Sequence, residues 1–67
     1  MAVARVTKIT ASSTKGFEDA IQQGVKRASK TVRGITGLHI VDEKASVKNG
    51  QIDEYRVTME LTFVLEE

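Results

Sequence analysis

Hydrophobic residues along this chain follow two different spacings, and each spacing predicts one kind of secondary structure. From Tyr55 to Leu65 every second residue is apolar, which is typical of a strand with one buried face. Residues 3–11 are rich in Val, Ile and Thr, so we expect another strand there, although neither of its faces is cleanly apolar. The second spacing, of three or four residues, predicts a helix with an apolar stripe along one side, formed by Phe17, Ile21, Val25, Ala28 and Val32.

The predicted helix has recognisable ends. A serine, Ser12 or Ser13, precedes the stripe and can accept hydrogen bonds from the free N–H groups of the first turn. Acidic residues stand near the start and basic residues near the end, which suits the helix dipole. Gly34 is a natural C-terminal stop. The small residues Ala20 and Gly24 flank the stripe and would let the helix approach a sheet closely.

Asn49-Gly50 predicts a two-residue hairpin turn, because both residues tolerate the positive φ of a type I′ turn. This turn sets Lys48 opposite Gln51 and thereby fixes the register of the two strands, unless a bulge shifts it by one residue. The expected pairs are Leu38 with Leu61 and Ile40 with Met59 on the buried face, and Gly37 with Thr62, His39 with Glu60, Val41 with Thr58 and Glu43 with Arg56 on the other face.

The order strand, helix, strand, strand predicts an α+β fold in which one helix covers a three-stranded antiparallel sheet. We expect residues 1–67 to form a single domain. A chain of 67 residues without cysteine cannot form disulfides or thiolate zinc sites, and its single histidine argues against an imidazole metal cluster. Because domains this short usually need disulfides, a structural metal or oligomerisation, we expect the chain to assemble with copies of itself.

Composition argues against several function classes. Ten Lys and Arg against nine Asp and Glu give a net charge of +1, which offers no basic surface for nucleic acid. No apolar run approaches the ~20 residues of a membrane span, and the N-terminal residues do not resemble a secretory signal. We therefore expect no nucleic-acid partner, no membrane partner and a cytoplasmic location.

Few residues of this chain are candidates for catalysis or metal binding. His39 could act as a general base oriented by Glu60, but the simpler interpretation is a surface pair. No Ser, Cys or Lys stands at a motif spacing that would identify it as a nucleophile. The chain is therefore expected not to be an enzyme. The pairs Asp42-Glu43 and Asp53-Glu54 offer oxygen ligands for Mg²⁺ or Ca²⁺, yet neighbours on a strand point to opposite faces. A metal site would then need carboxylates from several chains, and its ligands stay unknown.

Several segments taken together resemble the dodecin family. They are residues 6–13 leading into 16–21, residues 27–33, and residues 55–66. The resemblance covers nearly the whole chain. It implies a sheet partly wrapped around the helix, a hollow homododecamer, and a protein that stores or buffers flavin rather than an enzyme.

The resemblance also implies candidate site residues. In flavin-binding dodecins a Trp on the second strand stacks on the flavin ring, and a Gln on the third strand bonds the polar edge of the flavin. The Trp position falls here on Gly37 and the Gln position on Arg56. We therefore take Gly37, Arg56 and the nearby His39 as candidate cofactor-binding residues on the non-core face of the sheet.

The expected function is small-ligand binding and storage, with FMN, riboflavin or FAD as the ligand that the family implies. The alternative is a dodecin-like shell that binds calcium, magnesium or an anionic cofactor such as coenzyme A. The chain is similar to a Trp-lacking branch of dodecin-like proteins linked to calcium, because it has no Trp and carries Arg56 at the Gln position.

Overall fold

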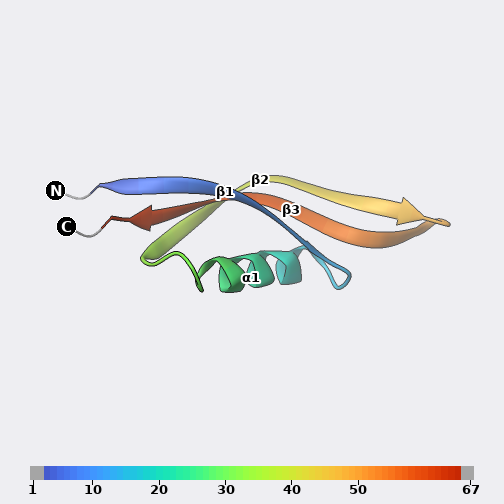
Figure 1. Cartoon of the computed structure of the whole chain (residues 1–67). Coiled ribbons are helices and arrows are strands. Elements are labelled where there is room, and N and C mark those ends of the chain that lie inside the picture. Colours follow the sequence, from blue (N-terminus) through green and yellow to red (C-terminus); the bar gives the residue numbers. More distant parts are fainter. Residues whose placement is uncertain (1–2, 66–67) are drawn as a thin grey trace.

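The computed structural model describes residues 3–65, which form three strands and one helix. In chain order these are β1 (Ala4–Ser13), α1 (Phe17–Ala28), β2 (Ile35–Lys48) and β3 (Gln51–Val64). The strands form one antiparallel sheet in the order β1-β3-β2, and the helix lies along one face of it (Figure 1). The predicted α+β class and the β-α-β-β order are confirmed.

The central strand β3 carries most of the core. Its alternate residues Val57, Met59 and Leu61 are fully buried, because β1 and β2 flank them and α1 packs over β1 and β3. The buried residues of the helix are the small ones, Ala20 and Gly24. A Cβ on Gly24 would lie 3.0 Å from Cε of Met59, so the helix approaches the sheet as closely as the small residues predicted.

The predicted serine cap at the start of the helix is wrong. The N-cap is Gly16, and no side chain caps the first turn. The hydroxyl of Ser13 instead donates to Oδ2 of Asp19 at 2.6 Å and accepts the N–H of Lys15 at 2.9 Å. Ser13 is the last residue of β1, so its hydroxyl closes the turn between strand and helix, as serines in turns often do.

The helix also ends earlier than the stripe predicted. It ends at Ala28, after which residues 29–31 tighten into a turn, so Val32 lies beyond it. The N–H groups of Thr31 and Val32 both donate to the carbonyl of Ala28, which satisfies a helix-end acceptor without glycine. Gly34 is therefore not the helix stop. It has a φ of 77° and precedes β2, and its carbonyl accepts the N–H of Val64 at 3.0 Å.

The hairpin turn and most of the register are as predicted. Asn49 and Gly50 have φ values of 54° and 76°, as a type I′ turn requires, and Lys48 opposes Gln51. The pairs confirmed further along are Leu38–Leu61, Ile40–Met59, Gly37–Thr62 and His39–Glu60.

Two predicted pairs between these regions are wrong. The register shifts between Ile40 and Asp42 and shifts back between Ser46 and Val47. Inside this interval Thr58 opposes Asp42 rather than Val41. Arg56 likewise opposes Lys44 rather than Glu43. Because these two irregularities cancel, the same register holds near the turn and from Gly37 to Ile40, and it shifts once more between Ile35 and Gly37.

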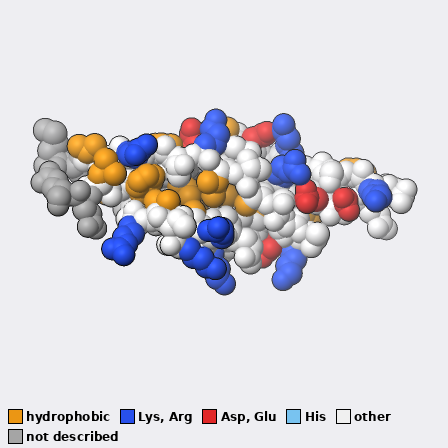
Figure 2. All heavy atoms as spheres, viewed as in Figure 1, with side chains coloured by type: hydrophobic (Ala, Val, Ile, Leu, Met, Phe, Trp, Pro, Cys, Tyr) orange, Lys and Arg blue, Asp and Glu red, His pale blue; other side chains and the backbone are white. Residues whose placement is uncertain are grey.

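The helix leaves part of the sheet uncovered. The described molecule is elongated, with extents of 52 × 20 × 13 Å, and the β2–β3 hairpin runs on past the helix to one end (Figure 1). Large hydrophobic residues therefore remain exposed, namely Val3, Val6, Leu38, Val41, Val47, Ile52 and Leu65. Figure 2 shows hydrophobic side chains reaching the surface where strands and helix meet. No helix within residues 3–65 is long and apolar enough to cross a membrane.

Gly34→Ala should lower the free energy of unfolding by about 1–2 kcal/mol, the cost of a left-handed conformation for an L-residue. The new Cβ would also lie 3.0 Å from the carbonyl oxygen of Val64. Urea unfolding at a fixed protomer concentration measures the change. Gly37→Ala is the matched control, because nothing lies within 4 Å of its Cβ position. Equal stability of the two variants would contradict the prediction.

Candidate functional site

The face of the sheet away from α1, here called the outer face, carries all three predicted cofactor-binding residues. Met59 and Leu61 point to the helix, so Glu60 and Thr62 on the same strand point away from it. Their partners on β2 are His39 and Gly37. The rows of this face are Val6–Thr62–Gly37, Lys8–Glu60–His39, Thr10–Thr58–Asp42 and Ser12–Arg56–Lys44.

Gly37 makes an open position on the outer face. No heavy atom lies within 4 Å of the place where its Cβ would stand, apart from its chain neighbours. In the same row Thr62 and Val6 are its partners, and Val6 is 58% exposed. A flat ligand could therefore lie over the backbone at Gly37 with a hydrophobic contact at one side.

His39 and Glu60 form the predicted cross-strand pair. Nδ1 of His39 lies 3.2 Å from Oε1 of Glu60, and the two side chains are 76% and 37% exposed. Lys8 stands on the other side of Glu60 in the same row. An imidazole this exposed is solvated on most of its surface, so the arrangement fits a surface pair that can donate or accept hydrogen bonds to a ligand.

Arg56 lies away from the other two candidates. Its row is six residues along β3 from the row of Gly37, which is about 20 Å at the rise of a strand. Nη2–H of Arg56 donates to Oε1 of Glu54 at 2.9 Å. Within one chain the candidates thus form two groups, Gly37 with His39, and Arg56 alone.

A shallow hollow of about 240 Å³ surrounds Arg56 and is lined by Lys44, Ala45, Ser46, Glu54 and Arg56. Two cationic side chains, Lys44 and Arg56, oppose each other here. Each is also held by a carboxylate, since Nζ of Lys44 lies 3.4 Å from Oδ2 of Asp42 and Arg56 bonds Glu54. The hollow offers hydrogen-bond donors to an anionic group.

The acidic pairs do not form a metal centre by themselves. Among residues 3–65, no three or more His, Cys, Asp or Glu side chains come together in a way that could hold a metal ion. Asp42 and Glu54 are engaged with Lys44 and Arg56. Any ion bound through these carboxylates would need further ligands from another copy.

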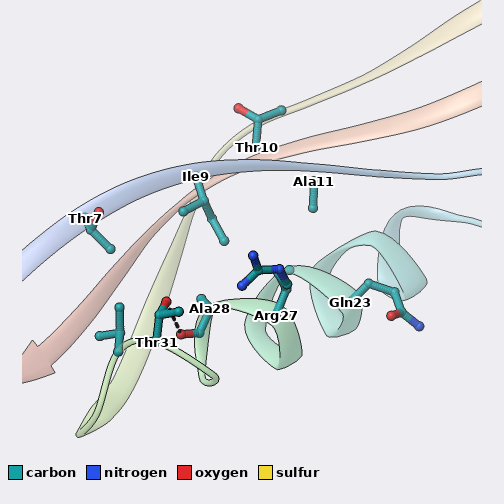
Figure 3. A pocket seen from close by; sticks show the side chains of 10 residues that line it. Thr7, Ile9, Thr10, Ala11, Gln23, Arg27, Ala28 and Thr31 are labelled. Atoms are coloured by element: carbon teal, nitrogen blue, oxygen red, sulfur yellow. Dashed lines mark hydrogen bonds between the residues drawn. The ribbon is translucent and has the colours of Figure 1, made fainter.

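A second, larger groove was not foreseen from the sequence. It lies between α1 and β1, has a volume of about 510 Å³ (Figure 3), and is called the α1–β1 groove. Its lining includes Ile9 and Ala11 from β1 and Gly24, Arg27 and Ala28 from α1. The sequence signal is the small residues on one side of the helix, which by themselves predict only a close helix–sheet contact.

The chain matches known proteins over nearly its whole length. A model of the Dodecin family matches residues 3–66. A dodecin of Thermus thermophilus is 31% identical over 65 residues, covering 97% of this chain and 94% of that protein.

Solved structures of dodecins have the same fold as this chain. A dodecin from Streptomyces davaonensis is 35% identical with a TM-score of 0.93, covering 98% of this chain and 97% of that one. A calcium dodecin from Mycobacterium tuberculosis, described as having a calcium-binding site, is 28% identical with a TM-score of 0.81, covering 96% and 91% of the two chains.

Glu60→Gln should change the free energy of unfolding by less than about 1 kcal/mol, because exposed ion pairs contribute little. Urea unfolding checks this, with Glu54→Gln as the matched control because it removes the exposed pair to Arg56. A loss above 2 kcal/mol for Glu60→Gln alone would show that the His39–Glu60 pair holds the sheet together and is not free to serve a ligand.

Proposed function

The chain belongs to the dodecin family, and we propose that it is a non-enzymatic homododecamer that binds and stores a small ligand, with flavin as the first candidate. Family membership supports the coarser statement, an oligomeric protein that binds a small ligand. The observation that carries the proposal is the open position at Gly37 on an outer face that no element of residues 3–65 covers.

Self-assembly is supported by the incomplete core. The fully buried hydrophobic residues are Ala20, Val57, Met59 and Leu61. Leu38, by contrast, opposes the buried Leu61 yet is 42% exposed, because the helix packs over β1 and β3. A hydrophobic residue at the edge of a core gains stability when another copy covers it.

The proposed ligand site is the row of Gly37 together with the His39–Glu60 pair. When two copies bring their outer faces together, the missing side chain at Gly37 leaves room for a ring system between the two sheets. The imidazole of His39 and the hydroxyl of Thr62 stand in or next to this row and can hydrogen-bond the polar edge of a flavin. Arg56, about 20 Å along the strand, would meet the same ligand only from a different copy.

The absence of a stacking aromatic residue predicts weak flavin binding. A buried Trp contributes ~200 Å² of contact and a stacking gain of ~0.5–1.5 kcal/mol. At roughly 25 cal/mol per Å² the lost contact is worth several kcal/mol, or a few powers of ten in affinity. FMN, riboflavin or FAD would then be buffered at high concentration rather than held tightly.

Gly37→Trp should therefore increase affinity for FMN and riboflavin by at least tenfold, measured by quenching of flavin fluorescence. The unmodified chain should quench only at high micromolar flavin. Val41→Trp is the control, since it adds the same residue to an exposed position on β2 outside the Gly37 row. If neither the unmodified chain nor the Gly37→Trp variant quenches flavin fluorescence, the flavin proposal is contradicted.

The second candidate ligand is a divalent cation, and the specific support is the likeness to the calcium dodecin. The exposed carboxylates of Asp42, Glu43 and Asp53 are hard oxygen ligands suited to calcium or magnesium. Copies of the chain would have to share the ion, since no such group forms within residues 3–65. Coenzyme A is a further anionic candidate for the hollow with Lys44 and Arg56.

If calcium is the ligand, millimolar Ca²⁺ should raise the melting temperature and a chelator should reverse the shift, because a ligand that binds only the folded state stabilises it. Differential scanning fluorimetry measures the shift, with Mg²⁺ in a parallel series. Asp53→Asn and Asp42→Asn test the carboxylates. An unchanged melting temperature at 10 mM of either ion would remove the cation candidate.

A further inference from the structure

The tip of the β2–β3 hairpin presents a hydrophobic pair that nothing in its own chain covers. Val47 and Ile52 oppose each other across the hairpin and are 68% and 53% exposed. Ala45, two residues before Val47, opposes Tyr55, whose ring contacts that of Phe17 at the start of the helix with centroids 5.0 Å apart. Since Tyr55 faces the helix, its partner Ala45 faces the same way, and so does Val47, two residues further along β2. Val47 and its partner Ile52 therefore lie on the helix side of the sheet, past the end of the helix.

The hairpin beyond the helix consists of two strands only. β1 pairs with β3 as far as Tyr55, so the part of the hairpin from Glu54 to the turn has neither a third strand nor a helix against it. Two-stranded ribbons are marginally stable in water without such support. Every residue of β2 from Val41 to Lys48 is exposed in the single chain, so a stable ribbon calls for a surface to lie on.

The α1–β1 groove is a hydrophobic surface of matching character. Ile9 and Ala11 line it from the strand, and Ala28 and Val32 line it from the helix and the turn after it. All four are only partly buried in the single chain. Figure 3 shows Ile9 and Ala11 pointing from β1 toward the helix across the open space.

The hairpin tip cannot reach the groove of its own chain. Ala11 is the lining residue of β1 nearest the tip, and it pairs with Val57. Val57 is five residues from Ile52 along the same strand, which is roughly 16 Å. A hairpin tip that docks in this groove must therefore come from another copy of the chain.

Charge favours one orientation of this contact. Arg27 is the charged residue that lines the groove. The tip carries both signs, with Lys48 next to Val47 and Asp53 next to Ile52. A tip that enters with its β3 strand toward α1 brings Asp53 to Arg27 and keeps Lys48 away from it.

We propose that the hairpin tip of one copy, through Val47 and Ile52, docks in the α1–β1 groove of a second copy. The proposal rests on the self-assembly proposed above and names the surfaces that meet. Tip and groove are different surfaces, so the contact is heterologous: each copy gives one tip and receives another. Repeated around a rotation axis, such contacts close into a ring.

Cross-linking tests the contact directly, because the chain contains no cysteine. The variant Val47→Cys with Ala28→Cys, treated with a short bismaleimide, should give a ladder of covalent oligomers on a denaturing gel. The matched control is Val47→Cys with Gln22→Cys, since Gln22 lies on the far side of the helix from the groove at 3.6 residues per turn. It should give at least tenfold less product, as should either groove or tip cysteine alone.

The outcomes separate this proposal from the proposed function. Sedimentation of the unmodified chain as a monomer would overturn both. An intact assembly in which the Ala28 and Gln22 variants cross-link equally, or in which Val47→Cys alone forms dimers, would overturn the tip–groove contact and leave assembly standing. Ile52→Asp should raise the concentration at which the assembly dissociates by at least tenfold, whereas Ile52→Val should leave it nearly unchanged; equal behaviour would also overturn the contact.

Discussion

The structure depends on the difference in length between its single helix and the two long strands of its sheet. The helix has 12 residues and is about 18 Å long, whereas β2 and β3 have 14 residues each and span about 46 Å. One helix of this size can bury the middle of a sheet but not its ends. The close contact at Gly24 and Met59 makes the covered part compact, and the uncovered remainder leaves a hydrophobic hairpin tip and an open groove.

The sequence predicted the elements well where a local rule fixes them. Asn49-Gly50 sets the turn, and the alternation from Tyr55 onward identifies the buried face of β3. The register was wrong only between the two bulges, because a bulge depends on the twist of the strands and leaves no distinct residue pattern. The helix end was wrong because Val32 continues the apolar spacing after the backbone has turned away.

The candidate site shows the same division between what spacing can and cannot predict. Alternation placed Gly37 and Arg56 on one face correctly, since the face of a strand residue follows from counting. The predicted pair of Gly37 with Thr62 also puts Arg56 six residues away along the strand, about 20 Å, so counting already separates the two rows. The α1–β1 groove escaped prediction because an open edge arises from the packing of helix on sheet, not from either segment.

The two bulges of the hairpin divide it into parts that can change independently. The register shifts after Ile40 and returns before Val47, so between these two points each strand carries one extra residue. A third shift lies between Ile35 and Gly37, on the far side of the Gly37 row. The pairs next to the turn and the pairs from Gly37 to Ile40 have the same register. Changes in the segment between the shifts after Ile40 and before Val47 can therefore re-aim the tip while the rows of Gly37 and His39 stay in place. Substitutions between these two shifts could in this way change the direction of the hairpin tip independently of the outer face around Gly37.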